Sequence, residues 1–148
     1  MEGLLKNKMV ISTSSSVAFR AVQAGEYVVG LSYEDGASTL LKSGATNIRL
    51  VYPEQGASAS AFSVAIIKNA PNMEAAKLMA NFLMSAEGQS ALGTELGTLR
   101  FTNANAVYDT PYLPATSEIY WVDRDIDWLV ENKEQILRRW NDIYMRTR

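Results

Sequence analysis

The chain has 148 residues, of which 47% are hydrophobic and 20% are charged, and its formal net charge is -2. This composition is typical of a folded globular chain, and the small negative charge argues against nucleic-acid binding. The sequence contains no cysteine and no histidine. Disulfides, thiol catalysis, sulfur-bound metals and a Ser-His-Asp triad are therefore excluded for this chain.

Helical periodicity first appears after a run of serines at residues 12–16. Ser15 or Ser16 is expected to cap a helix that ends at Gly25. Residues 27–33 are apolar and rich in β-branched side chains, which predicts a buried strand.

Helical and strand-like segments continue to alternate after this strand. A short helix is expected over residues 37–43, and a strand over residues 47–52 is stopped by Pro53. Residues 62–67 are predicted to form a further buried strand. Strand, helix and strand at this spacing favour an α/β fold with a parallel sheet.

The second half of the chain is predicted to be mainly helical. Asn72 is expected to cap a helix with one apolar face, and a further helix is expected over residues 87–96. Residues 100–124 are interpreted as a connection with little regular structure. From Ile126 the helical period returns, and Trp140 is expected in the core.

The beginning of the sequence shows none of the three regions of a signal peptide, and no segment is apolar enough to span a membrane. As it stands, the chain is expected to be soluble.

The serine run offers hydroxyl groups beside the free N–H groups at the start of a helix. This combination can bind an anion such as a phosphate, a phosphonate or a carboxylate. The alternative is an ordinary polar loop with one capping residue. The residues alone favour the loop, because no glycine signature accompanies the serines.

Tyr33, Glu34 and Asp35 stand at the carboxyl end of the first predicted strand, where ligands bind in open α/β sheets. They could accept hydrogen bonds from sugar hydroxyls, pair with an amine or bind a hard metal ion. A solvated turn is an equally good interpretation. Arg20 and Arg100 could bind an anion, although ordinary salt-bridge arginines are more common.

No base paired with a nucleophile, no glycine-rich phosphate loop and no metal-ligand spacing is present. We therefore expect neither an enzyme nor a resident cofactor or metal.

Three segments taken in order resemble a known family. They are STSSSVAFRAVQAGEYVVGLSYEDGA, VYPEQGASASAFSVAIIKNAPNMEAAKLMANFLMSAEGQSAL and DWLVENKEQILRRWNDIY. Together they are similar to the C-terminal part of extracellular solute-binding proteins of ABC importers, a group that includes ferric-ion, phosphonate and sugar-phosphate binders.

The resemblance implies part of a two-lobe periplasmic-binding-protein (type II) fold, an α/β fold with a mostly parallel sheet and helices on both faces. Residues 1–52 would belong to the second lobe, residues 53–60 to a hinge crossing, and residues 61–148 to the first lobe with the terminal helices. Most of the first lobe is missing from this chain, which implies a fragment.

The resemblance also implies which residues face the solute cleft. These are Ser14, Ser15, Tyr33, Glu34 and Asp35, with residues 57–61 as a weaker candidate. The implied function is the capture of a small polar, anionic organic solute, such as a sugar phosphate or a phosphonate. The solute would be delivered to the membrane subunits of an ABC importer at the periplasmic or extracellular face of the membrane.

Two alternatives stay open. Ferric-ion binding is one, although the family's adjacent tyrosines are replaced here by Tyr33 followed by Glu34 and Asp35. The other is an interaction or structural module that binds no solute and pairs with a separate chain. Because the missing part would leave apolar faces uncovered, we expect self-association as a dimer or pairing with the missing N-terminal half.

Overall fold

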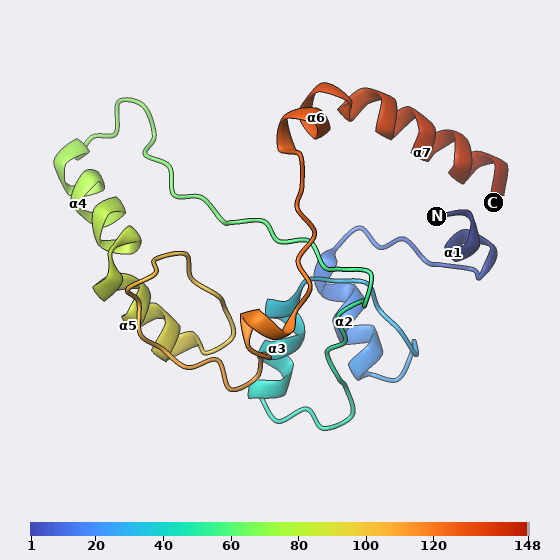
Figure 1. Ribbon diagram of the computed structural model, residues 1–148, viewed down its shortest axis with the longest axis horizontal. Coiled ribbons are helices and arrows are strands. Elements are labelled where there is room, and N and C mark those ends of the chain that lie inside the picture. Colours follow the sequence, from blue (N-terminus) through green and yellow to red (C-terminus); the bar gives the residue numbers. More distant parts are fainter. Residues whose placement is uncertain (148) are drawn as a thin grey trace.

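The computed structural model describes residues 1–147, and its regular structure is helical. In chain order the elements are α1 (Glu2–Lys6), α2 (Ser15–Gln23), α3 (Glu34–Lys42), α4 (Met73–Met84), α5 (Ala86–Leu96), the 3-10 helix η1 (Thr116–Glu118), α6 (Ile126–Glu131) and α7 (Lys133–Thr147). Three groups of helices are visible in Figure 1: α2 with α3, α4 with α5, and α7 with α1 and α6. Long extended segments join the groups.

The expected α/β fold with a mostly parallel sheet is wrong. Within residues 1–147 the β-type pairing consists of one isolated parallel bridge between Ala57 and Trp121. Segments 27–33, 47–52 and 62–67 run as unpaired chain, and no backbone hydrogen bond joins any of them to another. A strand needs a neighbouring strand for its N–H and C=O groups, and these three segments do not supply one another with that neighbour.

The first two long helices begin earlier than expected. Ser14, and not Ser15 or Ser16, is the N-cap of α2. α3 begins at Glu34, three residues before the expected start. Glu34 and Asp35 fill its first turn, where the helix dipole stabilises negative charge, so the Tyr-Glu-Asp sequence starts a helix and does not end a strand.

The α4–α5 pair follows the local signals of the sequence closely. Asn72 is the N-cap of α4, as predicted, and α5 ends at Leu96, as predicted. The Ser85 hydroxyl accepts a hydrogen bond of 3.0 Å from the Gly88 N–H at the start of α5. Gly97 then ends α5 in the left-handed conformation, with φ 63°.

The C-terminal helical region is divided in two. Asn132 ends α6, whose first turn is capped by the Asp125 carboxylate at 2.9 Å from the Trp128 N–H. The expectation that Trp140 lies in the core is wrong: it is half-buried and stacks on Tyr144 with ring centroids 6.1 Å apart. α7 contains no buried residue, because among the described elements it packs only on α1 and α6.

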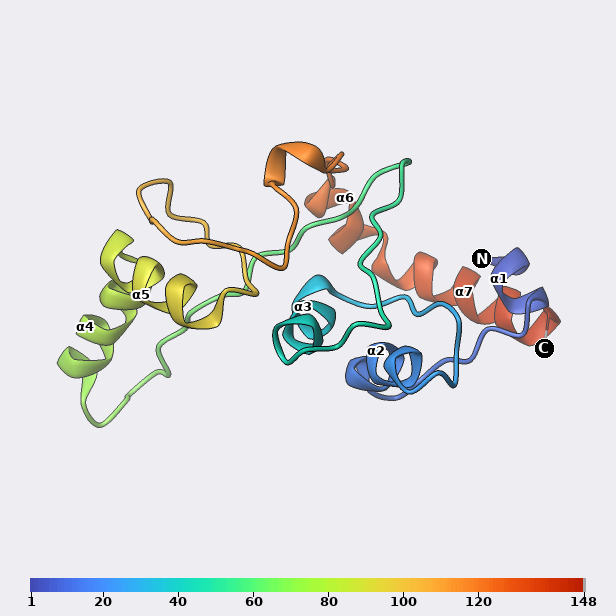
Figure 2. The same cartoon turned by 90° about the horizontal axis from the view of Figure 1, so that it is seen from below.

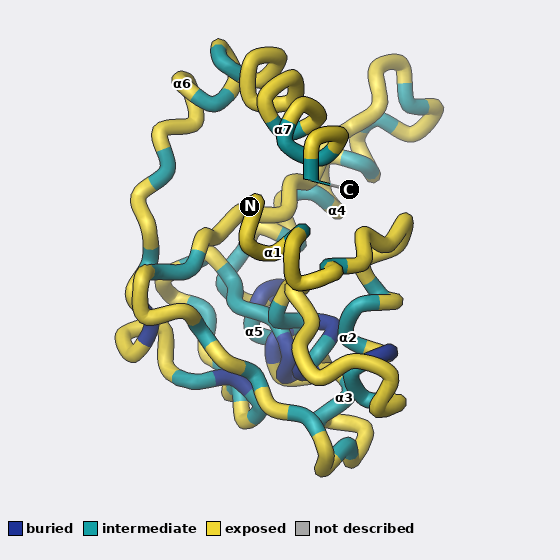
Figure 3. The backbone as a smooth tube through the Cα atoms, turned by 90° about the vertical axis from the view of Figure 1, so that its right-hand side faces the viewer, coloured by how far each residue is buried: buried dark blue, intermediate teal, exposed yellow. Residues whose placement is uncertain are grey.

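The core is small. Its buried hydrophobic side chains are Ala21, Leu113 and Ile119, and its buried polar side chains are Ser38, Gln89 and Thr98. Figure 3 shows the buried positions around α3 and α5, whereas α1 and α7 are exposed or half-buried. Residues 100–124 form the predicted irregular connection, interrupted by η1. None of the described helices is both long and apolar enough to cross a membrane.

The corner between α4 and α5 gives a stability prediction. A Cβ added at Gly88 would collide with the carbonyl oxygen of Phe82, which is backbone and cannot rotate away. We expect Gly88→Ala to lower the free energy of unfolding by about 1–3 kcal/mol, the usual cost of overpacking. Thermal or urea unfolding followed by circular dichroism measures this change.

Gly3→Ala in α1 is the matched control, since no atom lies within 4 Å of the added Cβ. Alanine favours a helix over glycine by up to about 1 kcal/mol, so this variant should be neutral or more stable. Equal effects of the two substitutions would show that the corner between α4 and α5 is not tightly packed around Gly88.

Candidate functional site

The start of α2 presents hydroxyl groups to solvent. The Ser14 hydroxyl lies 2.9 Å from that of Ser16, and the Ser12 hydroxyl donates to the Ser14 carbonyl at 3.0 Å. Although Ser14 is the N-cap, its side chain makes no hydrogen bond to the helix N–H groups in this structure. The positive end of α2 is therefore left without its usual side-chain acceptor.

The Tyr33 region lies beside these serines. The Ser32 hydroxyl donates to the Ser15 carbonyl at 3.4 Å, and the rings of Phe19 and Tyr33 meet edge to face with centroids 5.8 Å apart. Because α3 begins directly after Tyr33, the starts of α2 and α3 are close together. The Ser15 backbone is thus bonded to the residue before Tyr33, and within the described residues no hydrogen bond joins a hydroxyl of residues 12–16 to Tyr33.

Glu34 points towards a different part of the chain. Its carboxylate accepts hydrogen bonds from Arg100 Nε at 3.0 and 3.3 Å and from the Tyr52 hydroxyl at 2.5 Å. The Glu34 and Arg100 side chains are only 24% and 17% exposed. The negative charge of Glu34 is thus paired within the protein.

Arg100 uses its remaining nitrogens on the connection that follows it. They donate to the Thr116 hydroxyl at 2.8 Å and the Pro114 carbonyl at 2.7 Å, and the guanidinium carbon lies 5.9 Å from the Trp121 ring centre. The salt-bridge interpretation of Arg100 is therefore correct. Arg20 is exposed and makes no hydrogen bond or ion pair in the described structure.

Asp35 is also engaged within the protein. Its carboxylate accepts a hydrogen bond from the Thr98 hydroxyl at 3.0 Å. The fully buried Ser38 hydroxyl lies within hydrogen-bond distance of the Asp35 carbonyl at 3.1 Å and the Thr98 carbonyl at 3.2 Å. Asp35 and Glu34 together attach the first turn of α3 to residues 98–121.

Residues 57–61, the weaker site candidate, run beside residues 120–124, which directly precede α6. The Ala57 N–H donates to the Tyr120 carbonyl at 2.8 Å, and the Val122 N–H donates to the Ala57 carbonyl at 2.9 Å. The Arg124 guanidinium donates to the Ser60 hydroxyl at 2.6 Å. These contacts explain the isolated bridge and show that part of this segment is bound to its own chain.

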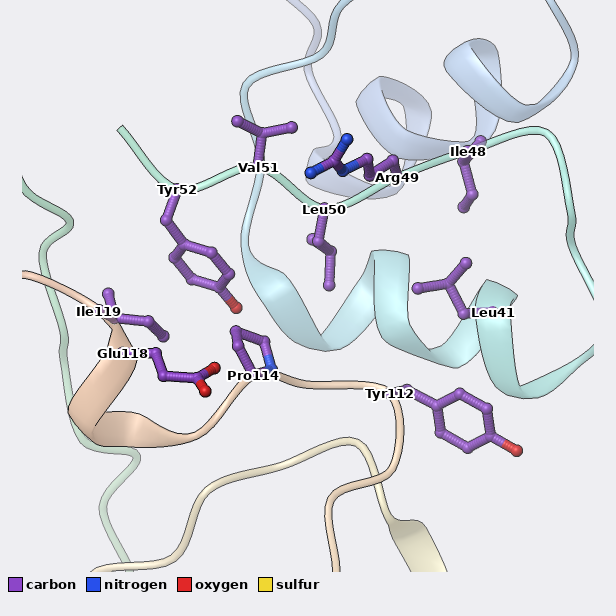
Figure 4. A pocket seen from close by; sticks show the side chains of 10 residues that line it. All are labelled: Leu41, Ile48, Arg49, Leu50, Val51, Tyr52, Tyr112, Pro114, Glu118 and Ile119. Carbon is purple, nitrogen blue, oxygen red and sulfur yellow. The ribbon is translucent and has the colours of Figure 1, made fainter. Parts of the chain in front are cut away.

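A hollow of about 550 Å³ lies between α3 and η1. In Figure 4, Leu50 points towards α3, Val51 points away from it, and the Tyr52 ring lies near Glu118. The lining includes none of the sequence-predicted site residues. Within residues 1–147 no group of three or more acidic side chains is placed to hold a metal ion.

A family model described as bacterial extracellular solute-binding protein matches residues 1–95. The chain belongs to this family. Neither the curated proteins nor the solved structures give a significant match. For a solute-binding protein, membership indicates a role in binding a small-molecule solute and a periplasmic or extracellular location, and it supports a binding role over an enzymatic one.

Tyr52, Arg100 and Trp121 surround Glu34 in this solute-binding protein, and sequence reasoning did not connect them. Tyr52 is the last residue of a predicted strand and Trp121 lies in an irregular connection, so neither position carries a local signal. Burial and the hydrogen bond to Glu34 raise the pKa of Tyr52 to about 12 from 10.0. The phenol therefore remains a hydrogen-bond donor to Glu34 at neutral pH.

The raised pKa predicts a stability change at high pH. Between pH 10 and pH 12 the unfolded chain loses the Tyr52 proton while the folded chain keeps it, so the free energy of unfolding falls as pH rises through this range. In Tyr52→Phe this part of the fall should disappear. Urea unfolding at a series of pH values measures the difference between the two proteins.

Tyr27→Phe is the control, because Tyr27 is 45% exposed and its hydroxyl makes no hydrogen bond within the described residues. Tyr27→Phe should show the same fall of unfolding free energy with pH as the wild type. If Tyr52→Phe shows that fall too, Tyr52 is not the group responsible.

Proposed function

We propose that this protein captures a small polar, anionic organic solute, such as a sugar phosphate or a phosphonate, for the membrane subunits of an ABC importer. The binding surface is the start of α2 together with the residues that precede α3. Ser14, Ser15 and Tyr33 contact the solute in this proposal. Glu34 and Asp35 have the role of positioning Tyr33 from the first turn of α3.

The observation that carries the proposal is the uncapped start of α2. Its N–H groups and the hydroxyls of residues 12–16 are hydrogen-bond donors at the positive end of a helix, and this is where anions bind. The recorded hydrogen bonds of the serine hydroxyls stay within residues 12–16, so a solute can replace them without breaking a tertiary contact.

The charges nearby are compatible with an anion. Glu34 is the acidic residue closest in sequence to Tyr33, and its carboxylate is already paired with Arg100. Asp35 is hydrogen-bonded to Thr98. Arg20, on α2 itself, is an exposed cation with no hydrogen bond or ion pair among the described residues, and it can add long-range attraction.

The division into residues 1–52, 53–60 and 61–148 also becomes part of the proposal. The boundaries at 52 and 60 fall in the long connection between α3 and α4 (Figure 1). The Lys42 ammonium of α3 donates to the Glu95 and Leu96 carbonyls at 2.6 and 2.9 Å, so any movement of residues 1–52 on solute binding carries the end of α5 with it.

Isothermal titration calorimetry of the purified protein tests the proposal. The titrants are a hexose phosphate, an alkyl phosphonate, the corresponding uncharged hexose and a ferric salt. We expect heat from the phosphate or the phosphonate and none from the uncharged sugar. Ser15→Ala should weaken that binding tenfold or more, because a hydrogen bond to a charged partner contributes about 1.5–3 kcal/mol.

Ser43→Ala, an exposed serine at the opposite end of α3, is the matched control and should bind like the wild type. A response to the ferric salt alone would replace the proposed solute class. Silence with every titrant, from a protein that unfolds cooperatively, would favour a module that binds no solute. A large fall in the thermal midpoint of Ser15→Ala with unchanged affinity would make Ser15 structural.

A further inference from the structure

The protein exposes more surface than a folded monomer of its mass. Its accessible surface is 11715 Å². For a mass of 16.3 kDa, a compact monomer exposes about 7,500 Å². The excess of about 4,200 Å² per chain is larger than the roughly 1,000–2,500 Å² that each copy contributes to an obligate dimer interface. The surface of this chain is thus large enough to include such an interface.

Residues 61–67 are an isolated part of this surface. All seven are exposed, with Phe62 at 85% and Ile67 at 80%. In the described structure the backbone N–H and C=O groups of residues 61–66 make no backbone hydrogen bond. Figures 1 and 2 show this green segment running alone between the α2–α3 group and α4.

The other two unpaired segments each pack against a helix. In residues 47–52, Ile48, Leu50 and Tyr52 are half-buried on the side of α3. In residues 28–32, a Cβ at Gly30 would lie 3.0 Å from the Ala18 carbonyl oxygen, so that backbone already rests on α2. Of these three segments, residues 61–67 are exposed at every position and, apart from the Ile67 carbonyl, free of backbone hydrogen bonds within the described structure, whereas the other two rest on a helix.

The sequence of this segment is suited to pairing with itself. Phe62, Val64 and Ile66 alternate along it and would share one face of a strand. No charged residue occurs from Ala57 to Ile67, so two copies can lie side by side without like charges facing each other. Aromatic and β-branched residues are also the side chains that favour strands.

We propose that residues 61–67 form an interface with a second copy of this chain, paired as antiparallel β-strands about a two-fold axis. Such an axis is perpendicular to the plane of the two-stranded ribbon. A side chain and its symmetry mate in the second copy therefore lie on the same face of the ribbon. The symmetric register centred on Val64 places Val64 opposite itself and Phe62 opposite Ile66. The apolar stripes of both copies then form one continuous face, as an isologous interface requires.

Sedimentation velocity of the full chain at micromolar concentration tests the proposal, and no solute is needed. We expect a dimer for the wild type. Val64→Lys places two like charges opposite each other at the axis and should raise the dimer dissociation constant at least tenfold. Val107→Lys changes a valine that is 80% exposed outside the segment and should remain dimeric.

A cysteine at the axis locates the contact independently. The chain has no cysteine, so Val64→Cys introduces a single thiol per copy. Directly opposed residues of antiparallel strands have Cβ atoms about 4.5–5.5 Å apart, close to disulfide distance. Mild oxidation should join Val64→Cys into a covalent dimer and leave Val107→Cys largely unjoined.

Circular dichroism of each variant verifies that it remains folded, which an exposed substitution should permit. A monomeric wild type would overturn the proposal. So would a dimer that persists in Val64→Lys, or equal cross-linking of the two cysteine variants.

Discussion

The ion pair between Glu34 and Arg100 is the contact on which the arrangement of this protein depends. Arg100 Nε lies 3.0 Å from the Glu34 carboxylate, and the other guanidinium nitrogens bind Thr116 and Pro114. A chain with so few buried apolar side chains obtains little stability from a hydrophobic core. Partly buried, charge-assisted hydrogen bonds therefore account for much of what joins α3 to the connection after α5.

This ion pair also separates two groups of residues that sequence reasoning had placed in one cleft. Glu34 and Asp35 face Arg100 and Thr98, whereas the serines at the start of α2 face solvent beside Tyr33. In the first turn of α3 the Glu34 charge is thereby paired with Arg100, and the Asp35 carboxylate is hydrogen-bonded to Thr98. Because both carboxylates bond to other parts of the protein, a surface for an anionic solute is compatible with their position next to Tyr33 in the sequence.

Sequence reasoning succeeded where the signals are local. The N-cap at Asn72 and the end of α5 at Leu96 depend on residues within one or two turns of helix. The sheet failed because residues 62–67 have the composition of a strand, but a strand also needs a partner that composition does not reveal. The site residues stay a prediction: the Ser15 carbonyl is bonded to Ser32, the residue before Tyr33, whereas Glu34 and Arg100 are 66 positions apart, and no local pattern connects them.

A double-mutant cycle on Glu34→Gln and Arg100→Met, measured by urea unfolding, tests the central contact most directly. If the ion pair joins the two halves of the chain, the two substitutions are not additive, and the coupling free energy is about 1 kcal/mol or more. The double variant should then be little less stable than the Arg100→Met variant. Additivity within about 0.3–0.5 kcal/mol would contradict the account, because the two side chains would then contribute to stability independently.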